Sequence, residues 1–288
     1  MATINASQDY DFISTLTFAS ASGTCRIEFL RGDFNTVSGT AYYRTGTSGS
    51  WTSLSVSGGS TTFPVGATTM QVAHDWNKSG NDYLTQSLAD QSTNLTEITI
   101  SQKAVISGVM GNYFMFKFAH DCPGLVSCDV PDTSGLTSAG TFFMGQYASE
   151  SEDLDLLSVP DTSGLTSVDD GFFSFYANEC NSLISLAIPD TSNITSVGLY
   201  FTLNYARNCS SLERLELPAV GWFASNNINW SVPSGRLNNV KGYVKNSTDL
   251  SDWQDLVVSG ETLYTNYVRD TDDVILESIN NSNFLTFM

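Results

Sequence analysis

The sequence predicts a mainly β fold in which a β-sandwich is followed by a repeat solenoid. Two observations predict it. Four prolines, Pro131, Pro160, Pro189 and Pro218, follow one another at intervals of 29 residues, and short alternating apolar segments separated by Gly-rich turns fill residues 1–75. Other residue types recur at the same interval, so the period belongs to a structural unit. These columns are Phe118/Tyr147/Tyr176/Tyr205, Ala119/Ala148/Ala177/Ala206, Leu125/Leu154/Leu183/Leu212 and Val130/Val159/Ile188/Leu217.

Each repeat contains a short strand that ends at the proline. In the segment Leu183-Ile184-Ser185-Leu186-Ala187-Ile188-Pro189, three recurring apolar residues point into a core, and the residues between them face outward. Proline ends the strand because it has no N–H for a further ladder bond. A period of roughly 20 to 29 residues with this pattern is typical of leucine-rich repeats, whose units bury their apolar sides by stacking. We therefore expect a leucine-rich-repeat solenoid over residues 91–237, with its first rung at residues 95–100.

The repeats resemble those of the BspA-like leucine-rich-repeat family over residues 93–245. The segments 190–197 (DTSNITSV) and 208–218 (NCSSLERLELP) are similar to the DTSNVT turn and the CSSLxxLxLP strand of that family. The Asn-Cys pair of the family pattern is complete at residues 208–209, keeps only the cysteine at Cys122 and Cys180, and is Glu150-Ser151 in the second copy. The family occurs on bacterial surface proteins, in some protist proteins and in virion proteins. The resemblance therefore implies the fold and leaves the function open.

The N-terminal part lacks the 29-residue period. Apolar alternation over residues 13–18, 25–29, 51–56 and 70–73 predicts several short strands at close spacing, which indicates an immunoglobulin-like β-sandwich. A polar tract over residues 75–91 separates it from the repeats, so we place a sandwich domain with its linker at residues 1–90. We expect this domain to fold independently.

The C-terminal part is predicted to cap the solenoid. A solenoid needs a terminal unit that covers the apolar end of its last coil, and residues 238–288 are in the place for it. Within them, Ser251-Asp252-Trp253-Gln254 has the capping-box spacing of a short helix.

Composition limits the partners. The 30 acidic and 12 basic residues give a net charge of −18, which opposes binding to nucleic acid or to anionic membranes. No stretch approaches the ~20 apolar residues of a membrane span, and the N-terminal residues have neither the basic nor the apolar region of a secretion leader. We expect either that a leader was removed or that the protein reaches the outside by another route, such as cell lysis.

Few residues are candidates for catalysis or for metal or phosphate binding. We expect the five cysteines to be buried free thiols, because Cys122, Cys180 and Cys209 share one repeat column and Cys128 occupies a strand column. The two histidines, His74 and His120, lie in no recognisable catalytic or metal spacing, and no Gly-rich phosphate loop is present. We therefore predict no catalytic residues, no metal and no cofactor.

Two short motifs allow alternative interpretations. The column of Asp132, Asp161 and Asp190 could recruit Ca²⁺, but each aspartate is expected instead to accept backbone N–H bonds in an Asx-turn after its strand. Arg31-Gly32-Asp33 spells an integrin-ligand tripeptide, although a hairpin turn explains it equally well.

The outward-facing strand positions are the best candidates for binding. They include Asp155, Leu156, Ile184, Ser185, Glu213 and Arg214, which stacked coils would place on one continuous sheet. Solenoids bind partners on such faces. We expect a non-enzymatic virion surface protein, such as a bacteriophage decoration, fibre or tail-associated adhesion protein, whose partners are other virion or surface proteins, or a host-surface protein or glycan. The alternative is an exported bacterial cell-surface adhesin, and homo-oligomerisation is left open.

Overall fold

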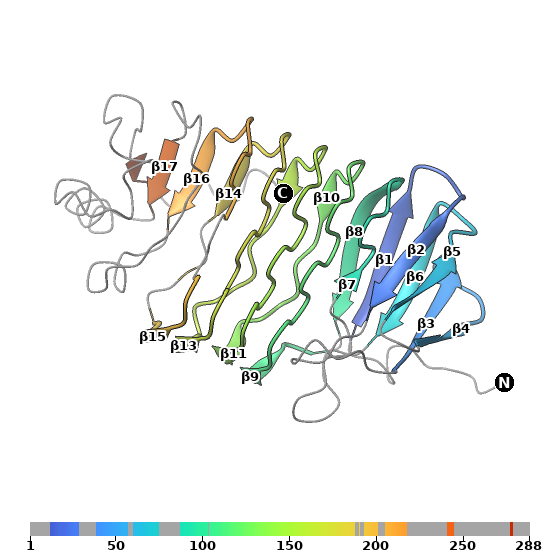
Figure 1. Cartoon of the computed structure of the whole chain (residues 1–288), viewed down its shortest axis with the longest axis horizontal. Helices are drawn as coiled ribbons and strands as arrows, with labels where there is room; N and C mark the ends of the chain where they lie inside the picture. The colour runs from blue at the N-terminus through green and yellow to red at the C-terminus, as the bar shows by residue number, and fades with distance from the viewer. Residues whose placement is uncertain are drawn as a thin grey trace.

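The computed structural model describes residues 12–28, 39–56, 60–74, 87–102, 104–187, 190, 193–200, 205–217, 241–244 and 277–278. Within these residues the protein is built from strands and turns and contains no helix. Figure 1 shows two sheets at the N-terminal end, followed by stacked coils that extend along the longest axis of the molecule. The predicted mainly β class and the repeat solenoid are confirmed.

The N-terminal residues form two sheets that pack face to face. One contains β1 (Phe12–Phe18), β3 (Gly39–Thr45), β4 (Thr52–Val56) and β6 (Thr69–His74), and the other contains β2 (Thr24–Glu28), β5 (Ser60–Pro64) and β7 (Ser87–Leu88). Strand β1 alternates between buried and half-buried residues, as a strand with one face in a core must. Its buried residues Phe12 and Leu16 share a core with Ile27 and Phe63 of the smaller sheet.

The larger sheet does not end at the N-terminal part. Strand β1 pairs on one side with β6 and on the other with β8 (Leu95–Gln102), which in turn pairs with the first solenoid strand. The resulting seven-stranded sheet has the order β12-β10-β8-β1-β6-β3-β4. It crosses the domain boundary predicted at residue 90. A separate immunoglobulin-like sandwich is therefore not confirmed, and that assignment stays a prediction.

Each solenoid coil contributes two short strands. The first set is β10 (Ser127–Cys128), β12 (Leu156–Leu157), β14 (Ser185–Ala187) and β16 (Arg214–Leu217), and the second set is β9 (Ser107–Met110), β11 (Gly135–Ala139), β13 (Ser167–Val168) and β15 (Ser196–Val197). All hydrogen-bonded pairs within the two sets are parallel. The predicted buried column is confirmed, since Leu125, Leu154, Leu183 and Leu212 are all buried.

The first set of strands departs from the prediction in one respect. Strands β10 and β12 belong to the seven-stranded sheet, whereas β14 and β16 begin a separate sheet that continues to β17 (Lys241–Val244) and β18 (Glu277–Ser278). The expectation of one continuous sheet is therefore wrong between β12 and β14, where the strands are only two and three residues long. Most of the predicted C-terminal cap, including residues 251–254, lies outside the described residues.

The segment that connects β9 to β10, and its equivalents in the later coils, has an unusual backbone. In the first coil φ is positive at Tyr113, Met115, Lys117, Ala119 and Asp121, and the same alternation recurs 29 residues later. Successive N–H groups serve different acceptors: Phe118 N–H donates to the Met115 carbonyl within the coil, and Lys117 N–H donates to the Gly145 carbonyl of the next coil. For residues other than glycine this left-handed conformation costs roughly 1–2 kcal/mol. Hydrogen bonds between coils compensate for that strain.

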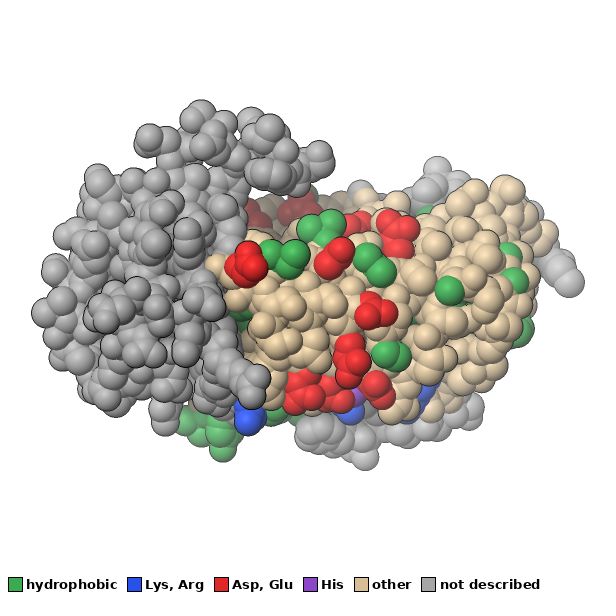
Figure 2. All heavy atoms as spheres, turned by 90° about the horizontal axis from the view of Figure 1, so that it is seen from above, with side chains coloured by type: hydrophobic (Ala, Val, Ile, Leu, Met, Phe, Trp, Pro, Cys, Tyr) green, Lys and Arg blue, Asp and Glu red, His purple; other side chains and the backbone are tan. Residues whose placement is uncertain are grey.

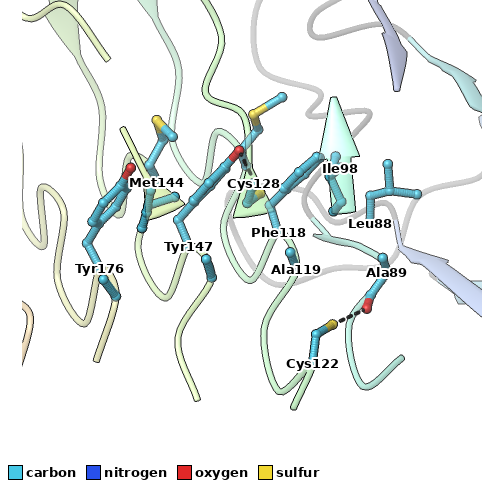
Figure 3. Packing of buried hydrophobic residues seen from close by; sticks show 14 of the residues in the cluster. Leu88, Ala89, Ile98, Phe118, Ala119, Cys122, Cys128, Met144, Tyr147 and Tyr176 are labelled. Atoms are coloured by element: carbon cyan, nitrogen blue, oxygen red, sulfur yellow. Dashed lines mark hydrogen bonds between the residues drawn. The ribbon is translucent and has the colours of Figure 1, made fainter. Parts of the chain in front are cut away.

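A ladder of aromatic rings runs through the solenoid core. Phe118, Tyr147, Tyr176 and Tyr205 stack with centroid separations of 5.1, 5.5 and 5.4 Å, and three of these side chains are labelled in Figure 3. Each tyrosine hydroxyl donates to a backbone carbonyl 18 residues earlier, as Tyr176 does to Ser158. The hydroxyls therefore satisfy carbonyl groups at the ends of the strands.

Tyr176→Phe is expected to lower the free energy of unfolding by about 1–2 kcal/mol, because the Ser158 carbonyl loses its partner inside the protein. Urea denaturation measures the change. Tyr200→Phe is the control, since the Tyr200 side chain is exposed and its hydroxyl removal should cost less than about 0.5 kcal/mol. Equal stability of the Tyr176 variant and the wild type would show that the buried hydrogen bond contributes nothing.

The thiols of the cysteine column donate hydrogen bonds to backbone carbonyls. All five cysteines are free and buried, as predicted. The thiols of Cys122, Cys180 and Cys209 donate to the carbonyls of Ala89, Ala148 and Ala177 at 2.9, 3.1 and 3.0 Å. In the second copy, the Ser151 hydroxyl makes the same bond to Ala119 at 3.2 Å, so the departure from the Asn-Cys pattern preserves the contact.

Candidate functional site

Four of the six predicted outward-facing residues are exposed at the surface. Leu156 and Ile184 are 63% and 53% exposed, and their neighbour Val126 is 42% exposed. Asp155 and Glu213 are also exposed, whereas Ser185 is half-buried. Arg214 begins β16, and its side chain lies outside the described part of the structure. We call Val126, Asp155, Leu156, Ile184 and Glu213 the strand patch.

The register of the coils sets the geometry of the strand patch. Ser127 pairs with Leu156, and Ser185 pairs with Arg214, so corresponding residues of successive coils share a column. Val126 and Asp155 directly precede the paired strands β10 and β12, which are ~4.8 Å apart. The coil of Ile184 stacks on the coil of Asp155 through the hydrogen bond from the Ser182 N–H to the Glu152 carbonyl, so Asp155 lies on the coil between those of Val126 and Ile184.

The strand patch combines exposed apolar groups with negative charge. Seen from above, the surface of the molecule carries Asp and Glu beside hydrophobic side chains, while Lys and Arg are few and near the margin of the view (Figure 2). Residues 104–217 include 14 acidic and three basic residues. Among the described residues, the ion pairs involve Arg26 and His120, and none involves Asp155 or Glu213.

His120 belongs to a network between the first coil and the N-terminal sheets. Its Nδ1 lies 2.8 Å from Asp90 Oδ1, its Nε2 lies 3.4 Å from Glu150 Oε1, and Asp90 also pairs with Arg26 at 3.2 Å. Asp90 and Glu150 each lie 30 residues from His120, one residue more than the repeat period, and our sequence reasoning missed this cluster. The network fixes the first coil to β2.

His120 and the nearby cysteines do not form a nucleophile–base pair in this network. Both ring nitrogens of His120 face carboxylates. The nearby Cys122 thiol donates to the Ala89 carbonyl (Figure 3), and burial raises the pKa of Cys122 well above its usual value. Burial likewise raises the pKa of Cys25 and of Cys128 to about 12, so these thiols stay protonated and unreactive at neutral pH. His74 ends β6, and its side chain is outside the described region.

Asp132 and Asp161 form the predicted turns, while the turn predicted at Asp190 involves residues outside the described ones. Asp132 Oδ1 accepts hydrogen bonds from the Ser134 N–H at 3.1 Å and from the Ser134 hydroxyl at 2.7 Å, and Asp161 Oδ1 accepts one from the Ser163 N–H at 2.9 Å. These are the expected Asx-turns. Within the described residues, no group of three or more His, Cys, Asp or Glu side chains is placed to hold a metal ion. Arg31-Gly32-Asp33 lies outside the residues that the structure describes.

The second set of strands presents a different surface. Threonine hydroxyls of Thr137, Thr166 and Thr195 donate to backbone carbonyls of the preceding coil at 3.0–3.2 Å, which uses their protons within the solenoid. Apolar residues are exposed on this side as well: Val109, in β9, is 72% exposed, and Leu199 and its neighbour Tyr200, which follow β15, are 67% and 59% exposed. Val109 and Leu199 are at least as exposed as Leu156 and Ile184, which makes them suitable control positions.

Comparison of the chain with protein-family models, with curated proteins and with solved structures found no match. The resemblance to BspA-like repeats therefore stays a prediction. In the described part of the chain, no helix could cross a membrane.

Proposed function

We propose that the protein is a non-enzymatic binding protein at the surface of a virion, such as a bacteriophage decoration, fibre or tail-associated adhesion protein. It acts through the strand patch, which contacts another virion protein or a host-surface protein or glycan. The finer fold assignment belongs to the same proposal: BspA-like leucine-rich repeats follow an immunoglobulin-like N-terminal part.

The observation that carries the binding role is the exposure of three aliphatic side chains on successive coils. Val126 and Ile184 directly precede β10 and β14, and Leu156 begins β12, whereas Cys128, Leu157 and Leu186 of these strands are buried. Clustered exposed apolar residues with a polar surround mark interaction surfaces. Backbone hydrogen bonds between the stacked coils hold the main chain of these residues in place, so little backbone entropy is lost when a partner binds.

The thiols favour the virion over the exported adhesin. All five cysteines are free, and none of them pairs with another. Proteins that fold in oxidising compartments commonly use disulfides, whereas proteins that fold in the cytosol keep free thiols. A virion protein assembled inside a host cell meets the second condition. The alternative, an exported bacterial adhesin, is favoured by the DTSNITSV segment at residues 190–197 and its likeness to surface-protein repeats.

Mass spectrometry of purified extracellular particles and of cell envelopes from the organism that carries the gene tests the location. Enrichment in particles together with capsid or tail proteins is the expected result. Enrichment in the envelope would instead favour the exported adhesin.

The double substitution Leu156→Lys with Ile184→Lys is expected to abolish attachment to the purified particles or cells. Both side chains lie outside the buried columns, so the melting temperature should stay nearly unchanged. The matched control is Val109→Lys with Leu199→Lys, which makes the same chemical change on the second set of strands and should leave attachment intact. Binding can be followed by co-sedimentation of labelled protein. Unimpaired attachment in the Leu156/Ile184 variant would move the contact elsewhere, and turnover of a glycan or peptide substrate would overturn the non-enzymatic proposal.

A further inference from the structure

We propose that the strand patch binds a cationic protein segment, in which an Arg or Lys side chain pairs with Asp155 while its aliphatic stem lies on Leu156 and Ile184. This inference rests on the proposed function, because it names the chemistry of the partner that the same surface takes.

Asp155 is positioned to accept a positive charge. Its backbone N–H donates to the Val126 carbonyl of the preceding coil at 3.1 Å, which fixes the residue on the surface. Its carboxylate is exposed and forms no ion pair with any described residue. Exposed aliphatic side chains flank it in its own column and beside it.

Arginine and lysine match this combination of groups. Both side chains bury an apolar stem against apolar surface while the charged head reaches a polar group. The guanidinium group of Arg can in addition form two parallel hydrogen bonds to one carboxylate. A stem lying across Leu156 and Ile184 would bring the head group to Asp155, and Glu213 offers a second carboxylate in the same column.

Electrostatics disfavours the other occupants. A second copy of this chain carries the same net charge of −18 and would be repelled, as would nucleic acid. The chain's own C-terminal residues 245–288 contain eight acidic and two basic residues, so they do not supply the missing positive charge. A cationic partner gains both long-range attraction and a local ion pair.

The test measures binding of synthetic peptides to the full-length protein by fluorescence anisotropy. The probe is a labelled peptide of alternating Arg and Leu. A Glu/Leu peptide and an Arg/Ser peptide of the same length separate the contributions of charge and apolar surface. We expect the Arg/Leu peptide to bind tightest, the Arg/Ser peptide to bind more weakly and the Glu/Leu peptide not to bind.

Two matched variants locate the site. Asp155→Asn is expected to weaken Arg/Leu peptide binding by about tenfold, as loss of a close charge pair does. Asp169→Asn is the control, because Asp169 is also exposed, lies in the solenoid and donates its backbone N–H to the preceding coil, yet follows β13 on the other set of strands. It should change the affinity by less than about twofold, the effect of screened long-range charge. The melting temperatures of both variants confirm that they are folded.

The outcomes separate this inference from the proposed function. Equal weakening by Asp155→Asn and Asp169→Asn would show that only the overall charge matters, and the inference would be wrong. Absence of Arg/Leu peptide binding would also overturn it. If the Leu156/Ile184 variant nevertheless loses attachment to particles or cells, the binding function stands and the partner is not cationic.

Discussion

Leu183→Asp is expected to destabilise the solenoid by about 3–5 kcal/mol or to prevent its folding. The Leu183 side chain is fully buried in the column formed with Leu125, Leu154 and Leu212. Aspartate at this position leaves a cavity and a carboxylate without a partner, and both effects are among the largest that single substitutions cause. Urea denaturation followed by circular dichroism measures the loss.

Ile184→Asp is the matched control for this prediction. It makes a comparable change one residue along the same chain, at a side chain that faces solvent. Its effect on stability should lie within about 0.5 kcal/mol of zero. A stable Leu183→Asp protein would contradict the register of the whole array, because Leu183 shares its column with one residue from each of the other coils.

The sequence predicted those features of the solenoid that depend on one-dimensional periodicity. The 29-residue offset identified the buried leucine column, the aromatic column of Tyr147 and Tyr176 and the exposure of Leu156 and Ile184. It also gave the Asx-turn at Asp132, because that turn uses only an aspartate and the backbone two residues later. Local and periodic interactions leave a direct trace in the sequence.

Other features have no such trace. Met115, Lys117 and Ala119 adopt a left-handed conformation that their residue types disfavour, so the sequence does not predict it. The conformation is selected by hydrogen bonds to neighbouring coils, which exist only once the coils are stacked. Likewise, the apolar alternation of β1 does not predict which strand pairs with its second edge. That strand is β8, from the start of the repeats.

The pairing of β1 with β8 bears on the strand patch as well. Because the seven-stranded sheet runs from β4 to β12, Val126 and Leu156 are attached to the N-terminal sheets by a continuous hydrogen-bonded ladder. The His120–Asp90–Arg26 contacts reinforce the same junction. The N-terminal part therefore acts as a cap for the first coil, as solenoids require.

A fragment of residues 1–90 is accordingly expected to show no cooperative melt, in contrast to the independent folding that the sequence alone predicts. This fragment lacks β8, whose register with β1 extends from the pair Phe12 and Gln102 to the pair Phe18 and Leu95. Leu95 and Ile98 of β8 are buried in the shared core, so their removal opens that core to water.

A fragment of residues 1–104 is the control, and it is expected to melt cooperatively. It retains β8. It loses the short pairing of β8 with β10, which joins Glu97 and Ile98 to Ser127 and Cys128, and the contacts of Ala89 and Asp90 with the first coil. Thermal melts of both fragments, monitored by circular dichroism, measure the difference. A cooperative transition in the shorter fragment at the same temperature as in the longer one would show that residues 1–90 form a separate domain and that β8 stabilises only the solenoid.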